Sequence, residues 1–199
     1  MARVLIAVPT FESVSPDTFK SLWDLDKGEH DCDFEFVRGY DCARARTKIA
    51  EASKPYDYVL MVDSDVIVPQ DALVNLMSHG VGVCMGFYAK RDRYDGCTTL
   101  CELGRKNYDS CFFADELKEM RESGKYLIEV KGGGAGCLLV RTSVFERVPF
   151  PWFSFVVNAD RSVLGEDYYF CSQCRKARIK VYADTRVGCK HCFRHWQDV

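Results

Sequence analysis

The chain has 199 residues, of which 47% are hydrophobic and 28% charged, and this composition excludes intrinsic disorder and fibrous repeats. Its 27 Lys and Arg residues nearly balance its 29 Asp and Glu residues, so the net charge of −2 gives no attraction to nucleic acid or to an anionic membrane. The longest apolar stretches, such as Val4–Pro9 and Val59–Val62, are far shorter than the ~20 residues of a membrane-spanning helix. We therefore expect a protein without a transmembrane segment.

The 11 cysteines bear on the cellular compartment. Their number is odd, and the N-terminal Met1-Ala2-Arg3 runs straight into an apolar strand without the pattern of a signal peptide. Cys84 and Cys137 lie inside apolar runs, which favours reduced, buried thiols over a disulfide framework. We predict a cytoplasmic protein with reduced cysteines.

The first half of the chain alternates predicted strands with predicted helices. The segments with strand patterns are Arg3–Pro9, Phe34–Val37, Tyr56–Val62 and Val81–Phe87. Helices are expected between them, one opening at Ser15-Pro16, one over Cys42–Ser53 and one opening at Pro69. This alternation predicts an α/β fold whose central, mostly parallel sheet is flanked by helices and holds ligands at its carboxyl edge.

The second half is less regular. Residues 88–108 are polar and are predicted as a loop, and a rigid aromatic turn is expected over Pro149–Phe153. The remaining expected elements are the helices Ala114–Ser123 and Gly165–Ala177 and the strands Tyr126–Val130, Cys137–Val140 and Lys180–Ala183. Because no linker or internal repeat interrupts the chain, we expect a single domain over residues 1–199.

The first candidate for chemistry is Asp63-Ser64-Asp65. The chain contains two other Asp-x-Asp strings, Asp24-Leu25-Asp26 and Asp31-Cys32-Asp33, but only Asp63-Ser64-Asp65 directly follows a buried strand. Two carboxylates there would lie at the carboxyl edge of a parallel sheet, and a hard divalent cation would offset their mutual repulsion. The alternative is a polar turn in which aspartate serves only as a turn former.

The second candidate is Gly165-Glu166-Asp167, which opens a predicted helix. By helical spacing, Asp167 begins the buried stripe that Phe170, Cys171 and Cys174 continue. The helix N-terminus favours the anionic form of a carboxylate in its first turn, and such a group could act as a general base toward a hydroxyl. The alternative is an acid that only complements the helix dipole.

Histidine and cysteine raise two further metal hypotheses. His191 follows the last predicted strand and could reach a metal at the sheet edge, with His195 as a nearby competitor and a hydrogen-bonded surface histidine as the alternative. The pairs Cys171/Cys174 and Cys189/Cys192 come close to the spacing of a zinc ribbon. Since the first pair falls on the apolar face of a predicted helix, buried thiols are the alternative there.

Other residue types give weaker signals. Gly133 and Gly134 belong to a glycine run that would let the backbone approach a ligand or a turn closely. Trp152 could stack on a sugar face or pack in the core. Of Arg44 and Arg46, at most one is expected to face the ligand edge, and a solvated surface is the alternative.

Several segments, in order along nearly the whole chain, carry a resemblance to a known family. They are Val4–Glu12, Ala43–Arg46 followed by Thr47, Tyr58–Val68, Trp152-Phe153, Gly165–Cys171, Ile179–Thr185 and His191. They resemble the GT-A fold glycosyltransferases, close to the family 2 type. In that comparison Val4–Glu12 is similar to the first strand and donor-nucleotide loop, and Ala43–Arg46 to an Arg-Ala-Arg-Asn helix start in which Thr47 replaces the asparagine. Tyr58–Val68 is similar to the strand that carries the DxD motif.

The resemblance implies a role for each candidate residue. The donor nucleotide would contact Pro9, Thr10, Glu12, Arg44, Arg46, Asp63 and Ser64. A Mn²⁺ or Mg²⁺ ion on the donor diphosphate would be held by Asp65 and His191, with Asp63 nearby. Asp167 would be the base for the acceptor hydroxyl, with Glu166 beside it. The acceptor or the sugar would contact Trp152, Gly133 and Gly134.

The resemblance implies a metal-dependent glycosyltransferase that moves a sugar, with inversion, from a UDP- or GDP-sugar to a hydroxyl of a glycan or polysaccharide precursor. Residues 1–90 would form the nucleotide-binding half and residues 91–199 the acceptor and catalytic half. The alternatives are a nucleotidyltransferase, a binding module stabilised by zinc on the four cysteines, and a catalytically silent sugar-nucleotide binder.

Overall fold

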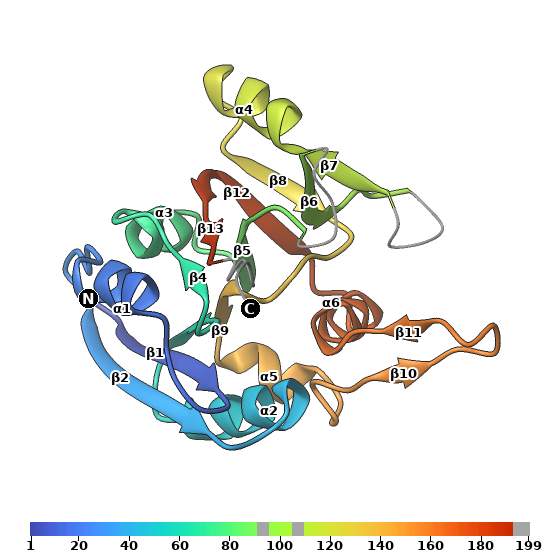
Figure 1. Cartoon of the computed structure of the whole chain (residues 1–199), viewed down its shortest axis with the longest axis horizontal. Helices are drawn as coiled ribbons and strands as arrows, with labels where there is room; N and C mark the ends of the chain where they lie inside the picture. Colours follow the sequence, from blue (N-terminus) through green and yellow to red (C-terminus); the bar gives the residue numbers. More distant parts are fainter. Residues whose placement is uncertain (91–95, 105–109, 193–199) are drawn as a thin grey trace, which may run out of the picture.

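The computed structural model describes residues 1–90, 96–104 and 110–192. A seven-stranded sheet crosses the molecule in the order β2-β1-β3-β9-β5-β12-β8 (Figure 1). Its strands are β1 (Arg3–Thr10), β2 (Asp31–Arg38), β3 (Tyr58–Val62), β5 (Val83–Phe87), β8 (Leu127–Val130), β9 (Cys137–Arg141) and β12 (Val181–Gly188). All strands except β9 and β8 run in one direction, so the sheet is mostly parallel, as predicted.

Six helices within the described residues accompany the sheet. They are α1 (Pro16–Trp23), α2 (Cys42–Ala52), α3 (Ala72–Ser78), α4 (Ala114–Glu122), α5 (Ser143–Arg147) and α6 (Glu166–Lys176). Two have their expected starts: Pro16 occupies the first turn of α1, and the Asp41 side chain caps α2 by accepting a hydrogen bond from the backbone N–H of Arg44. The predicted helices and the long strands are present, but the helix expected to open at Pro69 begins at Ala72.

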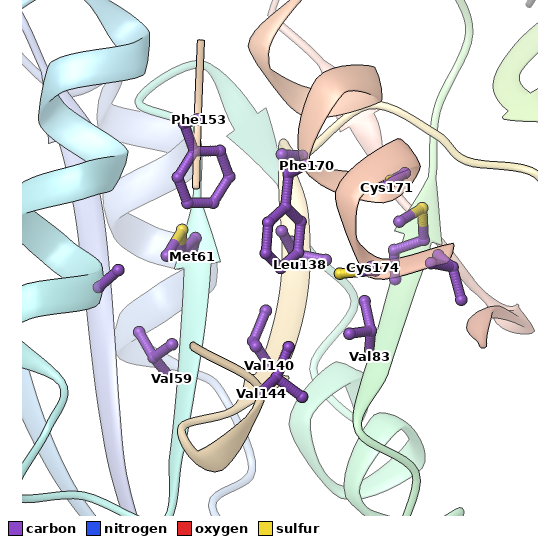
Figure 2. Close-up of a cluster of buried hydrophobic side chains, with 14 of the residues drawn as sticks. Val59, Met61, Val83, Leu138, Val140, Val144, Phe153, Phe170, Cys171 and Cys174 are labelled. Atoms are coloured by element: carbon purple, nitrogen blue, oxygen red, sulfur yellow. The ribbon is translucent and has the colours of Figure 1, made fainter. Parts of the chain in front are cut away.

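The sheet separates two apolar clusters, because successive side chains of a strand point to opposite faces. On β3, Val59 and Met61 enter one cluster together with α2, α5 and α6, whereas Leu60 and Val62 enter the other together with α1 and α3. Figure 2 shows the apolar side chains of α6 directed at the strands beneath them. Each of these buried side chains contributes about 1.5–3 kcal/mol, so the helices fix the sheet edge on which the candidate site is built.

Three short two-stranded ribbons lie outside the sheet. They are β4 (Val66–Ile67) with β13 (Lys190–His191), β6 (Cys97–Cys101) with β7 (Cys111–Phe113), and β10 (Val156–Val157) with β11 (Val163–Leu164). The strand β6 corrects the prediction that residues 88–108 form a loop. Thr98 and Leu100 of this strand are fully buried, and β6 is paired to β7 and touches Tyr88 and Lys90 through backbone hydrogen bonds.

The prediction of reduced cysteines is wrong for one pair, because Cys97 and Cys111 form a disulfide. These two residues lie on the paired strands β6 and β7 but are not directly opposite, because Cys97 pairs with Phe113 and Cys111 with Cys101; their Cα atoms are 6.1 Å apart. The other described cysteines are free thiols, and most of them are buried. Burial raises the pKa of the Cys171 thiol to about 12, so that sulfur stays protonated in the core.

The zinc hypothesis is also wrong for the four cysteines. Cys171 and Cys174 are buried in the cluster between α6 and the sheet, whereas Cys189 packs against the cluster on the opposite face. Across the part of the chain that the structure describes, no group of three His, Cys, Asp or Glu side chains is arranged to hold a metal ion.

Candidate active site

A cavity of about 300 Å³ opens at the carboxyl edge of β1 and β3. The turn after β3 is fixed by backbone hydrogen bonds, one from the N–H of Asp63 to the carbonyl of Gly136 and one from the N–H of Val66 to the carbonyl of Asp63. The lining residues are Pro9, Thr10, Phe11, Tyr40, Asp41, Cys42, Ala45, Asp63, Ser64 and Asp65. The strand ends of two parallel neighbours thus meet where an α/β sheet ordinarily binds its ligand.

Most of the residues predicted to bind the donor lie together in this cavity, namely Pro9, Thr10, Asp63 and Ser64. Glu12 and Arg44 do not line it. The carbonyl of Glu12 accepts a hydrogen bond from the Arg38 guanidinium, and the Arg44 guanidinium stacks over the ring of Tyr40, which does line the cavity. Arg44 therefore contacts Tyr40, which lines the cavity, and does not line the cavity itself.

Arg46 is buried, with a side chain that is only 3% exposed, which excludes the alternative of a solvated surface for this residue. Its Nη2 donates a 2.7 Å hydrogen bond to Asp63 Oδ1, its Nε donates to Glu166 Oε1 at 3.3 Å, and its Nη1 donates to the carbonyl of Ala135 at 3.3 Å. Burial opposes the positive charge, but the carboxylates of Asp63 and Glu166 together hold the pKa of Arg46 above its usual value. Arg46 thus joins the two acidic motifs that the sequence separates widely.

Asp167 stands in the first turn of α6, next to this ion-pair network. Its Oδ1 accepts a 2.7 Å hydrogen bond from the backbone N–H of Tyr168. Burial, followed by the neighbouring charge of Glu166, raises the pKa of Asp167 to about 6. A carboxylate with this pKa is ionised at neutral pH yet more basic than an ordinary aspartate, which suits a proton acceptor.

Asp65 and His191 are brought together by the ribbon of β4 and β13. His191 pairs with Val66 across the ribbon, and the N–H of Cys192 donates to the carbonyl of Asp65 at 2.8 Å. As a result Asp65 Oδ1 lies 3.5 Å from His191 Nε2. His195 lies outside the described residues.

This pair provides a carboxylate and an imidazole, donors that suit Mn²⁺ and that can also serve Mg²⁺ when phosphate oxygens complete the coordination. Two of the three predicted metal ligands therefore fit such an ion. The third, Asp63, directs Oδ1 to Arg46 instead.

The glycine run packs against protein. The N–H of Gly136 donates to the hydroxyl oxygen of Tyr88, and a Cβ on Gly134 would lie 2.5 Å from that oxygen. A Cβ on Gly133 would lie 2.6 Å from the sulfur of Met85. Close packing on the side chains of Tyr88 and Met85 thus explains the absence of side chains in this run, whereas the sequence predicted a close approach to a ligand or a turn.

Trp152 is not brought to the cavity. Its indole Nε1 donates to the carbonyls of Phe145 and Val148, and it lines a separate pocket with Ser53 and Lys54, which precede β3. Asp63 follows β3, so Trp152 lies toward the opposite end of that strand.

Tyr88 was overlooked in the sequence, although it follows β5 directly. It is 7% exposed, its ring lies 4.9 Å from that of His191 edge to face, and its hydroxyl holds the glycine run. Burial, together with the charges of Asp63 and Asp167, keeps the pKa of Tyr88 far above its usual value. Tyr88 meets the criterion that identified Asp63, because it is a polar residue directly after a buried strand.

The fold is similar to the folds of proteins of known structure. It is similar to that of A197 from STIV, with 21% identity, a TM-score of 0.65 and coverage of 96% of this chain and 86% of that one. It is also similar to GalNAc-T7 solved with UDP, GalNAc and Mn²⁺, with 10% identity, a TM-score of 0.60 and coverage of 98% of this chain and 45% of that one. No family model and no curated protein sequence matches the chain.

At these identities the likeness concerns the fold alone. The chain has the α/β fold of a GT-A glycosyltransferase, which confirms the expected fold class. None of the helices in the described ranges is long and apolar enough to cross a membrane.

Proposed function

We propose that this protein is a metal-dependent glycosyltransferase that moves a sugar from a UDP- or GDP-sugar to a hydroxyl of a glycan or polysaccharide precursor. The observation that carries the proposal is the position of Arg46, which bonds to Asp63 of one acidic motif and to Glu166 of the other beside the cavity. The fold similarity to GalNAc-T7, which was solved with UDP, GalNAc and Mn²⁺, supports the same class.

In this proposal residues 1–90 bind the nucleotide. The cavity is lined by Pro9 and Thr10 at the end of β1, by the aromatic ring of Tyr40, and by Ser64, which lies between the two aspartates in the sequence. A cavity of about 300 Å³ is at the small end of the range for ligand sites, so it would enclose only part of a nucleotide-sugar. The sugar would extend from the cavity toward Asp167.

Asp65 and His191 would hold Mn²⁺ or Mg²⁺ between them and the donor diphosphate. Bound there, the ion would neutralise negative charge that develops on the departing nucleoside diphosphate. Arg46 orients Asp63 at the same edge through their ion pair, so that the positive charge of the guanidinium balances this aspartate beside the donor.

Asp167 would take the proton from the acceptor hydroxyl, and its raised pKa of about 6 makes it a stronger base than an ordinary aspartate. With one base opposite the leaving diphosphate, the attack is direct and inverts the donor carbon. Glu166 is held by Arg46 and would set the position of the helix start that carries Asp167. We further propose that the protein acts in the cytoplasm.

A thermal-shift screen tests the proposal. UDP-, GDP-, CMP- and dTDP-sugars are each added with and without Mn²⁺, and a rise in melting temperature that needs both one nucleotide class and the metal is expected. NMR of the sugar product with candidate acceptors then reports turnover and the anomeric configuration. The absence of any shift would overturn the proposal, and a shift without turnover over a range of acceptors would favour a silent sugar-nucleotide binder.

A further inference from the structure

A second cleft, at the other edge of the sheet, gathers positive charge. Its volume is about 360 Å³, and it lies between the segments that precede β5 and β12 and the segment that follows β9. Four cationic side chains line it, and two hydroxyl side chains lie among them; these are Arg141, Arg147, Arg178 and Lys180, with Ser143 and Tyr182. None of the described lining residues is acidic.

Only part of this charge is compensated within the protein. Lys180 donates a 2.8 Å hydrogen bond to Glu129. Arg141 donates to the carbonyl of Gly80 at 3.0 Å and stacks over the Tyr58 ring, so its guanidinium is held in place with most of its donors unused. Within residues 1–90, 96–104 and 110–192, neither Arg147 nor Arg178 forms an ion pair.

Glu146 is adjacent to Arg147 in the chain, but it lines the separate pocket that contains Trp152. The cleft therefore concentrates cations in a protein whose net charge is −2. Like charges gathered in this way repel one another, and a bound anion would relieve that repulsion.

The backbone of Arg178 gives an independent indication. Its φ of +59° is in the left-handed region, and it directly follows Ala177, the C-cap residue of α6. Glycine is the usual residue at this position of a helix end, because a side chain there is sterically unfavourable. Because this backbone conformation disfavours any side chain, the presence of arginine at this position is not explained by the local fold.

We propose that this cleft binds an anion that carries two or more phosphate or carboxylate groups. Arginine suits such groups because its planar fork of N–H donors matches two oxygens at once, and three arginines surround this cleft. The site is distinct from the candidate active site: Arg141 pairs with Tyr58 at the start of β3, whereas Asp63 follows the end of that strand. The proposal does not depend on the proposed transferase activity.

Calorimetric titration of the full chain, freed of metal ions on a chelating resin and measured in a buffer without polyvalent anions, tests the proposal with three probes: inorganic phosphate, pyrophosphate and citrate. Pyrophosphate or citrate should bind at least ten times more tightly than phosphate, and which of the two binds better identifies the anionic group. Arg147→Gln and Arg178→Gln should each weaken that binding at least tenfold. Arg175→Gln is the matched control, because Arg175 is exposed on α6 close to Arg178 but does not line the cleft. This variant should bind the probes as tightly as the unmodified protein does.

Three results would overturn the proposal. One is the absence of measurable heat with both multivalent probes, and a second is equal weakening in all three variants, which would indicate a general charge effect. Binding that persists in Arg147→Gln and Arg178→Gln would place the probe elsewhere, for example in the cavity at Asp63, and would also overturn it.

A fourth variant, Arg178→Gly, separates binding from folding. If the arginine serves the ligand, this variant loses binding while its melting temperature is no lower than that of the unmodified protein, because glycine tolerates the left-handed backbone. A lowered melting temperature would assign Arg178 to the fold and remove it from the proposed site.

Discussion

The buried Arg46 forms an ion pair with the partly exposed Asp63, in which Nη2 lies 2.7 Å from Oδ1, and the same guanidinium reaches the buried Glu166 with Nε. Removing one partner from such a pair leaves a charge without compensation in the protein interior. The arrangement depends on the fork of the guanidinium, which a lysine ammonium cannot reproduce.

Arg46→Gln is therefore expected to lower the free energy of unfolding by about 3 kcal/mol or more, because two carboxylates lose their common cation. Arg46→Lys should recover only part of this loss. Urea denaturation followed by circular dichroism measures both. Arg44→Gln, which changes the neighbouring arginine that stacks on Tyr40, serves as the control and should cost less than about 1 kcal/mol. Equal losses for Arg44→Gln and Arg46→Gln would contradict the role of the buried pair.

The raised pKa of Asp167 leads to a pH prediction. Because the carboxylate must be ionised to accept a proton, kcat should fall as the pH drops through about 6 and should be constant above that value. Asp167→Asn should remove this limb of the profile and lower kcat by about two orders of magnitude or more, with donor affinity nearly unchanged. A variant that kept both its rate and the acid limb would show that another group is the base.

The pair of Asp65 and His191 predicts a metal phenotype. Asp65→Asn and His191→Gln should each abolish the Mn²⁺-dependent part of the thermal shift with a nucleotide-sugar, because each removes one of the two donors. Asp31→Asn, in one of the other Asp-x-Asp strings and exposed on β2, is the matched control and should keep the full shift. Metal-dependent binding that survived both substitutions would exclude the pair as ligands.

Because Gly134 packs closely on Tyr88, we predict that Tyr88→Phe offsets part of the loss of stability caused by Gly134→Ala. Gly134→Ala should lower the free energy of unfolding by about 1–3 kcal/mol, since its Cβ would lie 2.5 Å from the Tyr88 hydroxyl oxygen. Tyr88→Phe removes that oxygen, so the double variant should lose less than the sum of the two single losses. Denaturation of the four proteins gives the coupling energy. Strict additivity would mean that the two residues do not limit each other's volume.

The strand and helix order of the first half could be predicted from the sequence because each strand there is an apolar run closed by turn residues. The strand β6 could not, because it lies in a polar stretch without an apolar run, and β7, β10 and β11 have only two or three residues each. The antiparallel insertion of β9 between β3 and β5 is a tertiary choice that local sequence does not encode.

The candidate site could be predicted where a residue directly follows a buried strand, as Asp63 and Asp65 do. It could not be predicted for Arg46, because the burial of a charged residue depends on partners as distant as Glu166. The disulfide was missed for a similar reason: Cys97 and Cys111 are 14 residues apart in the sequence, and the fold of β6 and β7 brings them together without making them directly opposite.

The place of β9 in the sheet has a consequence for any attempt to divide the protein. The strands β3 and β5 both belong to residues 1–90, yet β9 from the second half lies between them and bonds to both. A fragment cut after residue 90 would leave the inner edges of both strands without hydrogen-bond partners, and its counterpart would carry an isolated strand. The two fragments should therefore be insoluble when expressed separately and should reconstitute one another when co-expressed, as split reporter proteins do.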